Sequence, residues 1–425
     1  MRYYATALFL AIVLAVPWAA VNYPLQTDAV LSAIGRAGGE FAAAILSHNP
    51  KSIADIQTKY EASTVPQSPK VKILIVPGHE PDYGGAEYKD PTYGPVLERE
   101  LTVELGQDLQ DFLKADGHYQ TFITRDTQAW NPVFADYFKQ SWASIISWMK
   151  DARQDMAYLI SVGSTTKPVA QVIHHAVPDD VAIRLYGITK WANDNDIDIT
   201  VHIHFNDYPG HGSGSGKYTG FAIYVPEHDY ANSPTTRVIA KTVFSRLAKY
   251  NAVSDLKGES TGIVEEPDLI AIGANNTANS ASMLIEYSYI YEPQVTDPAV
   301  RHTFLKELAY ETYLGLQDFF APVAAAKLSY TYDTLMLPHS WGSPLLGKND
   351  APEDVFALQT ALVQDGDYPP TGRTMNDCPR SGKIGPCTKT AIQEFQDKHG
   401  ISGEPGIVGP KTIEELNQLY STKVI

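Results

Sequence analysis

Two histidines and one glutamate stand where α/β proteins often build their sites. His79 comes shortly after an apolar run, His204 ends an alternating run, and Glu98 opens a stretch with helical spacing. The carboxyl ends of parallel strands meet at one edge of a sheet, so side chains from distant parts of a chain converge there. Two imidazoles and one carboxylate form a common catalytic zinc set that leaves the fourth position for water. The three residues are therefore candidate ligands of Zn2+, with Glu100 and His202 as nearby competitors.

A fourth candidate, Glu286, is a carboxylate at the end of the apolar run 283–286. A charge buried in such a run is costly unless it is paired or performs acid–base chemistry. Each signal also has an ordinary alternative. A histidine after a strand is commonly a packed loop residue, a glutamate at a helix start complements the helix dipole, and Glu286 could be a structural ion-pair partner. The combination of the four residues, rather than any one of them, favours a site.

The hydrophobic pattern predicts the elements that would position these residues. Strands are predicted at 72–76, 119–124, 197–204, 218–225 and 282–287, and helices at 97–115, 134–159, 181–193, 235–250 and 298–320. In the first helix, apolar residues recur at every fourth position from Leu101 to Leu113. Strands that alternate with helices indicate a sheet protein built from βαβ units.

The composition excludes several classes of function. At roughly 100–200 residues per domain, the 425 residues leave room for two or three domains. The 33 Lys and Arg against 49 Asp and Glu give a net charge of −16, so no nucleic-acid partner is expected. The same charge argues against binding to anionic lipid through a basic face. The two cysteines, Cys378 and Cys387, are too few for a disulfide-dense scaffold or a four-cysteine metal site.

Residues 1–21 hold an uncharged apolar run after Arg2, and we predict a signal peptide or a retained membrane anchor there. The run is about 19 residues long, just enough to span a bilayer. Pro17 and Trp18 stand where a cleavage site needs small residues, which slightly favours the anchor. A buried core helix is the less favoured alternative. Export would place the remaining chain outside the cytoplasm, in the cell envelope, with residues 22–70 as a helical spacer and linker.

Four blocks within residues 72–291 resemble the zinc-dependent N-acetylmuramoyl-L-alanine amidases of the amidase-3 type. The blocks are Ile75–His79 with Gly84 and Gly85, then Glu98 with its helix up to Gly117 and Thr124–Asp126, then His202–Asn206 with Gly220–Ala222, and lastly Met283–Glu286. Their order and spacing carry the resemblance. It implies an α/β fold with a mixed central sheet flanked by helices, in a catalytic domain at 71–325.

The resemblance also implies a role for each of the four residues. His79, Glu98 and His204 match the family's zinc ligands, and Glu286 matches its catalytic carboxylate. The implied reaction is hydrolysis, by zinc-activated water, of the amide bond between N-acetylmuramic acid and L-alanine in peptidoglycan.

The family pattern also chooses between neighbouring candidates. Glu98 keeps the family's distance to the helix end at Gly117, so it is preferred to Glu100. His204 precedes Asn206 as the pattern requires, so it is preferred to His202.

This chain departs from the family pattern in two places. Val76 stands where the family usually has an aspartate, and Glu80 and Pro81 replace a glycine pair. A long segment rich in Trp and Tyr, residues 127–180, intervenes where the family is usually short. This segment is predicted to be a helical insert. It could be a lid or a docking element for a regulatory protein, or a packed decoration without a regulatory role.

Residues 350–425 resemble the three-helix peptidoglycan-binding domain 1, after a linker at 326–349. The matching elements are Leu358-Gln359, Phe395-Gln396 and the glycine-rich 406–412. Cys378 and Cys387 flank a loop before the second helix, where a disulfide would staple it, with free buried thiols as the alternative. The resemblance therefore predicts a cell-wall amidase. The alternatives are another zinc peptidase or amide hydrolase acting on stem peptides, and a non-catalytic wall-binding or activator protein.

Overall fold

The computed structural model describes residues 49–163, 177–208, 216–322, 334–347 and 350–421. The predicted export segment and most of the predicted spacer lie outside these residues. Within them, no helix combines the length and apolar character needed to cross a membrane. The described residues fall into two compact units, one with residues 151–163 and the other with residues 49–150 and the described part of 177–421. The second unit holds the sheet and all the candidate site residues.

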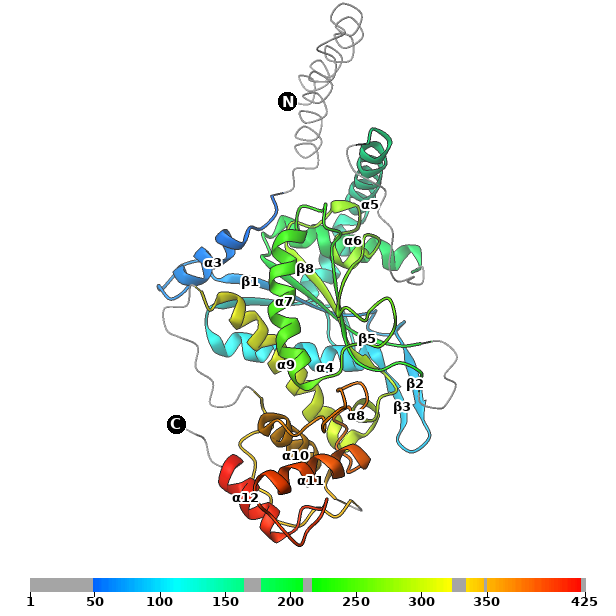
Figure 1. Cartoon of the computed structure of the whole chain (residues 1–425). Coiled ribbons are helices and arrows are strands. Elements are labelled where there is room, and N and C mark those ends of the chain that lie inside the picture. Colours follow the sequence, from blue (N-terminus) through cyan, green and yellow to red (C-terminus); the bar gives the residue numbers. More distant parts are fainter. Residues whose placement is uncertain (1–48, 164–176, 209–215, 323–333, 348–349, 422–425) are drawn as a thin grey trace, which may run out of the picture. The chain divides into compact units, whose positions relative to one another are not determined.

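A six-stranded mixed sheet forms the centre of the second unit (Figure 1). Its order is β4-β1-β5-β8-β6-β7, with bounds Tyr119–Ile123, Val71–Pro77, Ile199–Asn206, Ala281–Tyr289, Ala222–Val225 and Ile263–Glu265. The first four strands run parallel to one another, and β6 pairs antiparallel with β8. The prediction of an α/β fold with a mixed central sheet is confirmed.

Helices cover both faces of this sheet because the side chains of β1 alternate. Ile73 and Ile75 pack with α4 (Glu98–Asp116), α7 (Ser233–Tyr250) and α9 (Pro298–Phe320). Leu74 and Val76 pack on the other face with α6 (Asp179–Asp194) and the first half of α5 (Pro132–Ser161). β1 is thus buried on both sides, as a near-continuous apolar strand must be.

The shorter elements frame the candidate site. The hairpin β2 (Glu87–Asp90) and β3 (Gly94–Leu97) leads directly into α4. The 3-10 turns η2 (Ile270–Ile272) and η3 (Ala274–Asn276) precede β8, and α8 (Pro293–Thr296) precedes α9.

Two predicted strand limits differ from the structure. β5 continues to Asn206, so His204 lies inside the strand rather than at its end. The strand predicted from 218 begins only at Ala222. Gly220 has φ +98, and a Cβ there would lie 2.6 Å from the carbonyl oxygen of Ala252. The backbone therefore turns beside Gly220 before it can extend.

The part of the predicted spacer that the structure describes packs onto the sheet unit. Helix α3 (Ile53–Ala62) begins after Ser52, whose hydroxyl accepts a hydrogen bond from the Asp55 N–H. Ile56 and Tyr60 are buried in the main core, and Lys59 Nζ lies 2.7 Å from Asp198. A segment expected as a linker thus contributes apolar contacts and an ion pair to the body.

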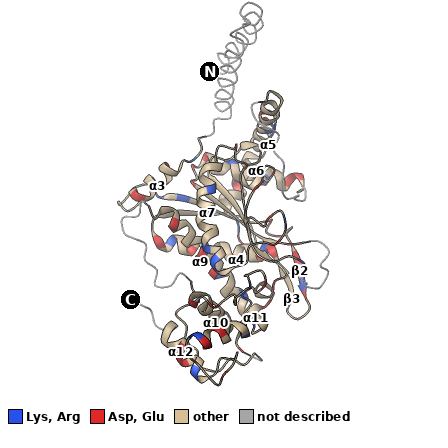
Figure 2. Cartoon of the chain, in the orientation of Figure 1, with Lys and Arg blue, Asp and Glu red and all other residues tan. Residues whose placement is uncertain are grey.

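The C-terminal region contains three helices with their own core, α10 (Pro352–Asp365), α11 (Pro386–Lys398) and α12 (Pro410–Tyr420). Each begins with proline at a position where the missing N–H costs no hydrogen bond. Trp341 and Leu345, from the predicted linker, are buried in the same core. Acidic and basic residues are intermixed on α11 and α12, whereas α10 carries acidic residues and no Lys or Arg (Figure 2).

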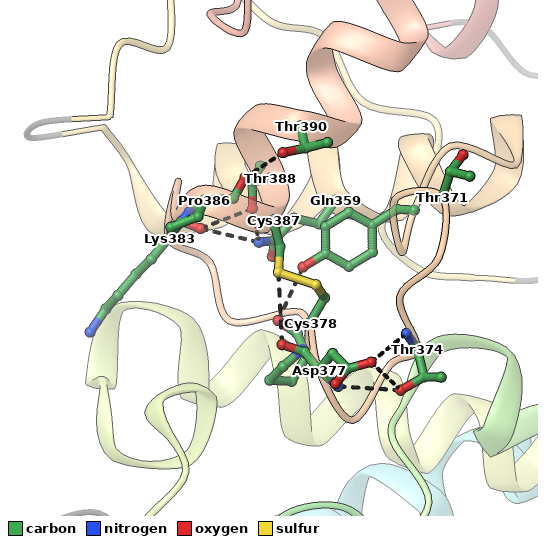
Figure 3. Close-up of a disulfide and its surroundings, with 12 residues drawn as sticks. Gln359, Thr371, Thr374, Asp377, Cys378, Lys383, Pro386, Cys387, Thr388 and Thr390 are labelled. Carbon is green, nitrogen blue, oxygen red and sulfur yellow. Dashed lines mark hydrogen bonds between the residues drawn. A yellow bond between two sulfur atoms is a disulfide. The ribbon is translucent and has the colours of Figure 1, made fainter.

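Cys378 and Cys387 form a disulfide, as predicted, with Cα atoms 5.8 Å apart (Figure 3). The bond closes the loop that leads into α11. Gln359 of α10 supports the same loop, because its side-chain oxygen accepts hydrogen bonds from the backbone N–H groups of Ser381 and Gly382. The loop is therefore held both covalently and by a buried amide.

Candidate metal centre

His79 follows β1 on a tight turn that its neighbours make possible. His79 itself has φ +69, an uncommon value for a residue with a side chain. A Cβ at Gly78 would lie 2.4 Å from the ring of His204, and a Cβ at Gly85 would lie 2.9 Å from the ring of His79. The two glycines thus leave room for the two imidazoles to approach each other.

Glu98 is the first residue of α4 and is buried. Its two carboxylate oxygens accept hydrogen bonds from backbone N–H groups, Oε2 from Ala86 at 2.7 Å and Oε1 from Phe205 at 3.0 Å. The hairpin on one side and β5 on the other therefore fix its orientation. The competitor Glu100 is exposed.

The structure brings His79, Glu98 and His204 together. His79 Nε2 lies 2.8 Å from Glu98 Oε2, and His204 Nδ1 lies 3.1 Å from Glu98 Oε1. One donor atom from each residue lies within 4.8 Å of the others. His79 Nε2 is buried and, despite its short distance to Glu98, has no hydrogen-bond partner of ordinary geometry among the described residues. A buried imidazole nitrogen without a hydrogen bond, which faces a carboxylate and a second imidazole, is suited to bind a metal ion. Two histidines and one glutamate are a donor set that suits zinc.

The charges in this cluster depend on one another. Burial alone would raise the pKa of Glu98, but the two histidines hold it well below its usual value. Burial lowers the pKa of His204, although the hydrogen bond to Glu98 opposes this effect. A carboxylate kept ionised and an imidazole kept neutral are the protonation states that a metal requires of its ligands.

Glu286 lies beside His204 in the sheet, because the two residues are register partners on β8 and β5. Its Oε2 atom is buried and makes no hydrogen bond within the described part of the chain. Burial raises the pKa of Glu286 well above the usual value, and the negative charges of Glu98 and Glu259 raise it further. A carboxyl group with unused hydrogen-bonding capacity and a raised pKa next to a metal set is suited to proton transfer.

The second histidine of β5, His202, is not part of the donor cluster. It is 1% exposed, and burial lowers its pKa to about 3, so it stays neutral. Of the two histidines on this strand, His204 alone faces the other donors.

The candidate ligands and Glu286 line a cavity of about 870 Å³. One further wall is largely apolar and comes from α6 and η2, for example Leu185, Ile188 and Ile270. Charged residues such as Glu266 and Asp268 also line the cavity. A polar reaction centre beside an apolar wall is a common form of binding site for a medium-sized ligand.

Arg125 holds the backbone next to two of the candidate ligands, a role that the sequence did not indicate. It is 1% exposed and donates hydrogen bonds to the carbonyl oxygens of Gly78 and Arg99. Burial lowers the pKa of its guanidinium to about 10. Arg125 thereby ties the loop before His79 to the first turn of α4. The signal in the sequence was the block Thr124–Asp126, which resembled the family without indicating its function.

Glu80, which replaces a family glycine, forms a second support. Its carboxylate accepts hydrogen bonds from Arg184 Nε at 2.8 Å and from Trp130 Nε1 at 3.1 Å. The substitution thus joins the His79 loop to α6 and to the start of the predicted insert. The sequence marked Glu80 as a departure but gave no indication of its partners.

Two regions of the chain match known protein families. Residues 150–318 match the family described as N-acetylmuramoyl-L-alanine amidase, and residues 351–416 match a family of peptidoglycan binding domains. The first match contains His204 and Glu286, whereas His79 and Glu98 precede it.

One curated protein, the zinc D-Ala-D-Ala carboxypeptidase of Streptomyces albus G, is 34% identical over 99 residues. The match covers 23% of this chain and 36% of the carboxypeptidase, so the chain spans only about a third of that relative's length.

Two amidase structures are similar at low identity. The N-acetylmuramoyl-L-alanine amidase from Clostridium difficile 630 has 16% identity and a TM-score of 0.37, over 59% of this chain and 96% of that one. The amidase Ami1 from Mycobacterium smegmatis has the same identity and TM-score, over 59% and 97%. Two separate regions of the chain are thus similar to known families, residues 150–318 to the N-acetylmuramoyl-L-alanine amidases and residues 351–416 to peptidoglycan binding domains.

Proposed function

We propose that the protein is a zinc-dependent amidase that cleaves the bond between N-acetylmuramic acid and L-alanine in peptidoglycan. The observation that carries the proposal is the donor cluster of His79, Glu98 and His204 beside the buried Glu286, in one cavity. The match of residues 150–318 to the amidase family supports the choice of bond.

His79, Glu98 and His204 would hold the zinc ion, with Glu98 kept in place by two backbone N–H groups. Bound zinc supplies a Lewis acid that polarises the scissile carbonyl and makes water more acidic. Glu286 would accept the proton of the attacking water at Oε2 and pass it to the leaving amine of L-alanine. The apolar wall from α6 and η2 would exclude bulk water from the reacting groups.

The C-terminal domain would hold the enzyme on its polymeric substrate, since residues 351–416 match peptidoglycan binding domains. We also propose extracytoplasmic action in the cell envelope, with residues 1–21 as the export signal or membrane anchor. The segment 127–180 would be the docking element for a regulatory protein, because it is tied to the His79 loop through Trp130 and Glu80.

Digestion of purified sacculi tests the reaction. The zinc-loaded protein should release stem peptides with a new L-alanine amino terminus, measured by mass spectrometry of the soluble fragments. The carboxypeptidase match makes a stem-peptide peptidase the second candidate, and release of D-alanine with intact muramoyl links would favour it. Binding to sacculi without any cleavage would favour a non-catalytic wall protein.

Variants of the centre test the roles of its residues. E98Q should reduce bound zinc to well under one ion per chain, whereas E100Q, an exposed neighbour on the same helix, should keep it.

E286Q should retain zinc and lose activity by about 100-fold or more, the loss expected for a missing proton-transfer group. Full activity of E286Q on sacculi would rule out Glu286 as the base.

A further inference from the structure

Glu259 is a buried carboxylate between α7 and β7 that sequence reasoning did not single out. It is 1% exposed and accepts hydrogen bonds from four neutral groups. Oε1 accepts from Asn206 Nδ2 at 2.8 Å and from the Tyr224 hydroxyl at 2.6 Å, and Oε2 accepts from the hydroxyls of Ser254 and Tyr289. A buried carboxyl group is costly, and within the described residues its hydrogen-bond donors are all neutral, so its retention calls for an explanation.

One of its four partners, Asn206, lies in the wall of the reaction cavity. The pairing of β5 with β8 is regular up to His204 and shifts its register before Asn206. Such an irregularity re-aims the following side chain, so the regular ladder no longer fixes its direction. Asn206 therefore needs another contact to hold its amide in one orientation.

Glu259 supplies that contact and determines which way the amide faces. Both of its carboxylate oxygens accept hydrogen bonds, so the NH₂ end of Asn206 faces Glu259. The opposite end, Oδ1, accepts from the backbone N–H of Asp207 at 2.9 Å. The second N–H of Asn206 makes no hydrogen bond within the described part of the chain.

We propose that Glu259 is a positioning residue for the amidase reaction. It holds the Asn206 amide so that the remaining N–H donates to an oxygen of the substrate in the cavity. The inference rests on the proposed function, because it places a substrate of that reaction beside His204 and Glu286. Tyr224, Ser254 and Tyr289 serve the same purpose indirectly, since their hydroxyls satisfy the other lone pairs of the buried carboxylate.

Steady-state kinetics on a soluble muramoyl peptide, with zinc content measured for each variant, tests the inference. E259A and N206A should each lower kcat/KM about tenfold, the loss typical of one hydrogen bond, while zinc stays at one ion per chain. The double variant E259A/N206A should lose no more than N206A alone when kcat/KM is compared on its pH plateau, where the effect of Glu259 on the pKa of Glu286 does not contribute and both changes remove the same donor. E259Q should lose less than about threefold, since its amide can still accept from Asn206 and donate to the hydroxyl oxygens.

A matched control is D198N, which changes another buried carboxylate at the opposite end of β5, where Asp198 pairs with Lys59. D198N should leave kcat/KM unchanged even if it lowers thermal stability. Additive losses in the double variant, or wild-type kinetics of E259A, would overturn the role of Glu259. If E259A does not fold, N206A decides alone, because full activity without the Asn206 amide excludes the inference.

The failures of the two proposals can be told apart. A zinc-loaded wild-type protein that cleaves nothing overturns the proposed function and the positioning role with it. A wild type that cleaves normally and is matched by N206A overturns the positioning role alone.

Discussion

Space at single residues decides whether the donor atoms can meet. Gly85 has φ +88, and a Cβ there would lie 2.9 Å from the ring of His79 and 3.2 Å from Glu98 Oε2. Gly94 has nearly the same backbone angle, φ +90, but a Cβ there would meet nothing within 4 Å. The two glycines therefore separate the cost of an unusual backbone angle from the cost of crowding the site.

We expect G85A to lower zinc affinity and amidase activity at least about tenfold, because a shift of the His79 ring alters the spacing of the donor atoms. G94A should match the wild type in both properties and show only the modest loss of stability that both substitutions share. Zinc affinity is measured by competition with a chromophoric chelator, and stability by thermal unfolding. Equal zinc affinity of G85A and the wild type would mean that the crowding is relieved without cost.

The candidate ligands could be predicted from the sequence because their residue types and local neighbours form a pattern. His79 follows an apolar strand and Glu98 opens an amphipathic helix, and both features are visible within about a dozen residues. Arg184 could not be predicted as the partner of Glu80, nor Glu259 as the partner of Asn206. These contacts join residues 104 and 53 positions apart, so they depend on how the elements pack.

At the scale of elements, the sequence predicted the longer helices and five of the six strands of the main sheet, but neither β7 nor the hairpin β2–β3. Amphipathic spacing located α4 and α9 to within one or two residues. β5 runs two residues past its predicted end at His204, because the polar Asn206 still pairs with β8 through a register shift. Alternation of apolar and polar residues detects the buried part of a strand and not its polar end.

Two neighbouring aspartates at the end of α10, Asp365 and Asp367, have pKa values shifted in opposite directions. Asp365, at the end of α10, lies close to Lys398 and His399 and to the hydroxyl of Tyr420. Burial would raise its pKa, but these partners hold it at about 2. Asp367 has the opposite shift, since burial and its hydrogen bond to Asp365 raise its pKa to about 6.

A pH-dependent effect on stability follows from Asp367. Below about pH 4 the Asp367 carboxyl is protonated in both the folded and the unfolded chain. Above about pH 6 it is ionised in both, and because its pKa is higher in the folded chain, this ionisation lowers the free energy of unfolding. D367N should therefore raise the free energy of unfolding by about 1 kcal/mol at pH 7, a value reduced for the partial exposure of the cluster. The gain should disappear as the pH falls to about 4.

Thermal unfolding of the full metal-free chain at several pH values measures this effect. D365N is the matched control, because its pKa is lowered and its ionised form stabilises the fold above about pH 4. It should destabilise the chain about equally at pH 7 and pH 4, and this loss should shrink only as the pH falls from about 4 to about 2. A gain from D367N that is the same at pH 4 and pH 7 would contradict the assignment.

At the scale of the whole molecule, one arginine joins the disulfide loop to helix α9. Arg380 Nη2 lies 3.0 Å from Glu307 Oε2 on α9, and both side chains are 1% exposed. Arg380 Nε also donates to the carbonyl oxygen of Tyr250 at 2.8 Å, and its guanidinium stacks against the Phe356 ring at 4.5 Å. A buried pair of this kind is costly to break, because the remaining charge has no water to solvate it.

The contact predicts that the C-terminal helices and the sheet unfold together. R380M should destabilise the chain by about 3 kcal/mol, because it leaves Glu307 buried without its cation. It should also split a single thermal transition into two, because the loop loses its buried ion pair with Glu307 of α9 while the disulfide still joins the ends of the loop. The control is K383Q in the same loop, where Lys383 is half exposed and 4.0 Å from Asp297. It should leave both the stability and the single transition unchanged.

Calorimetry of the full chain measures both the stability and the number of transitions. One transition in R380M would mean that apolar contacts such as that of Phe304 with Phe356 suffice to couple the two regions.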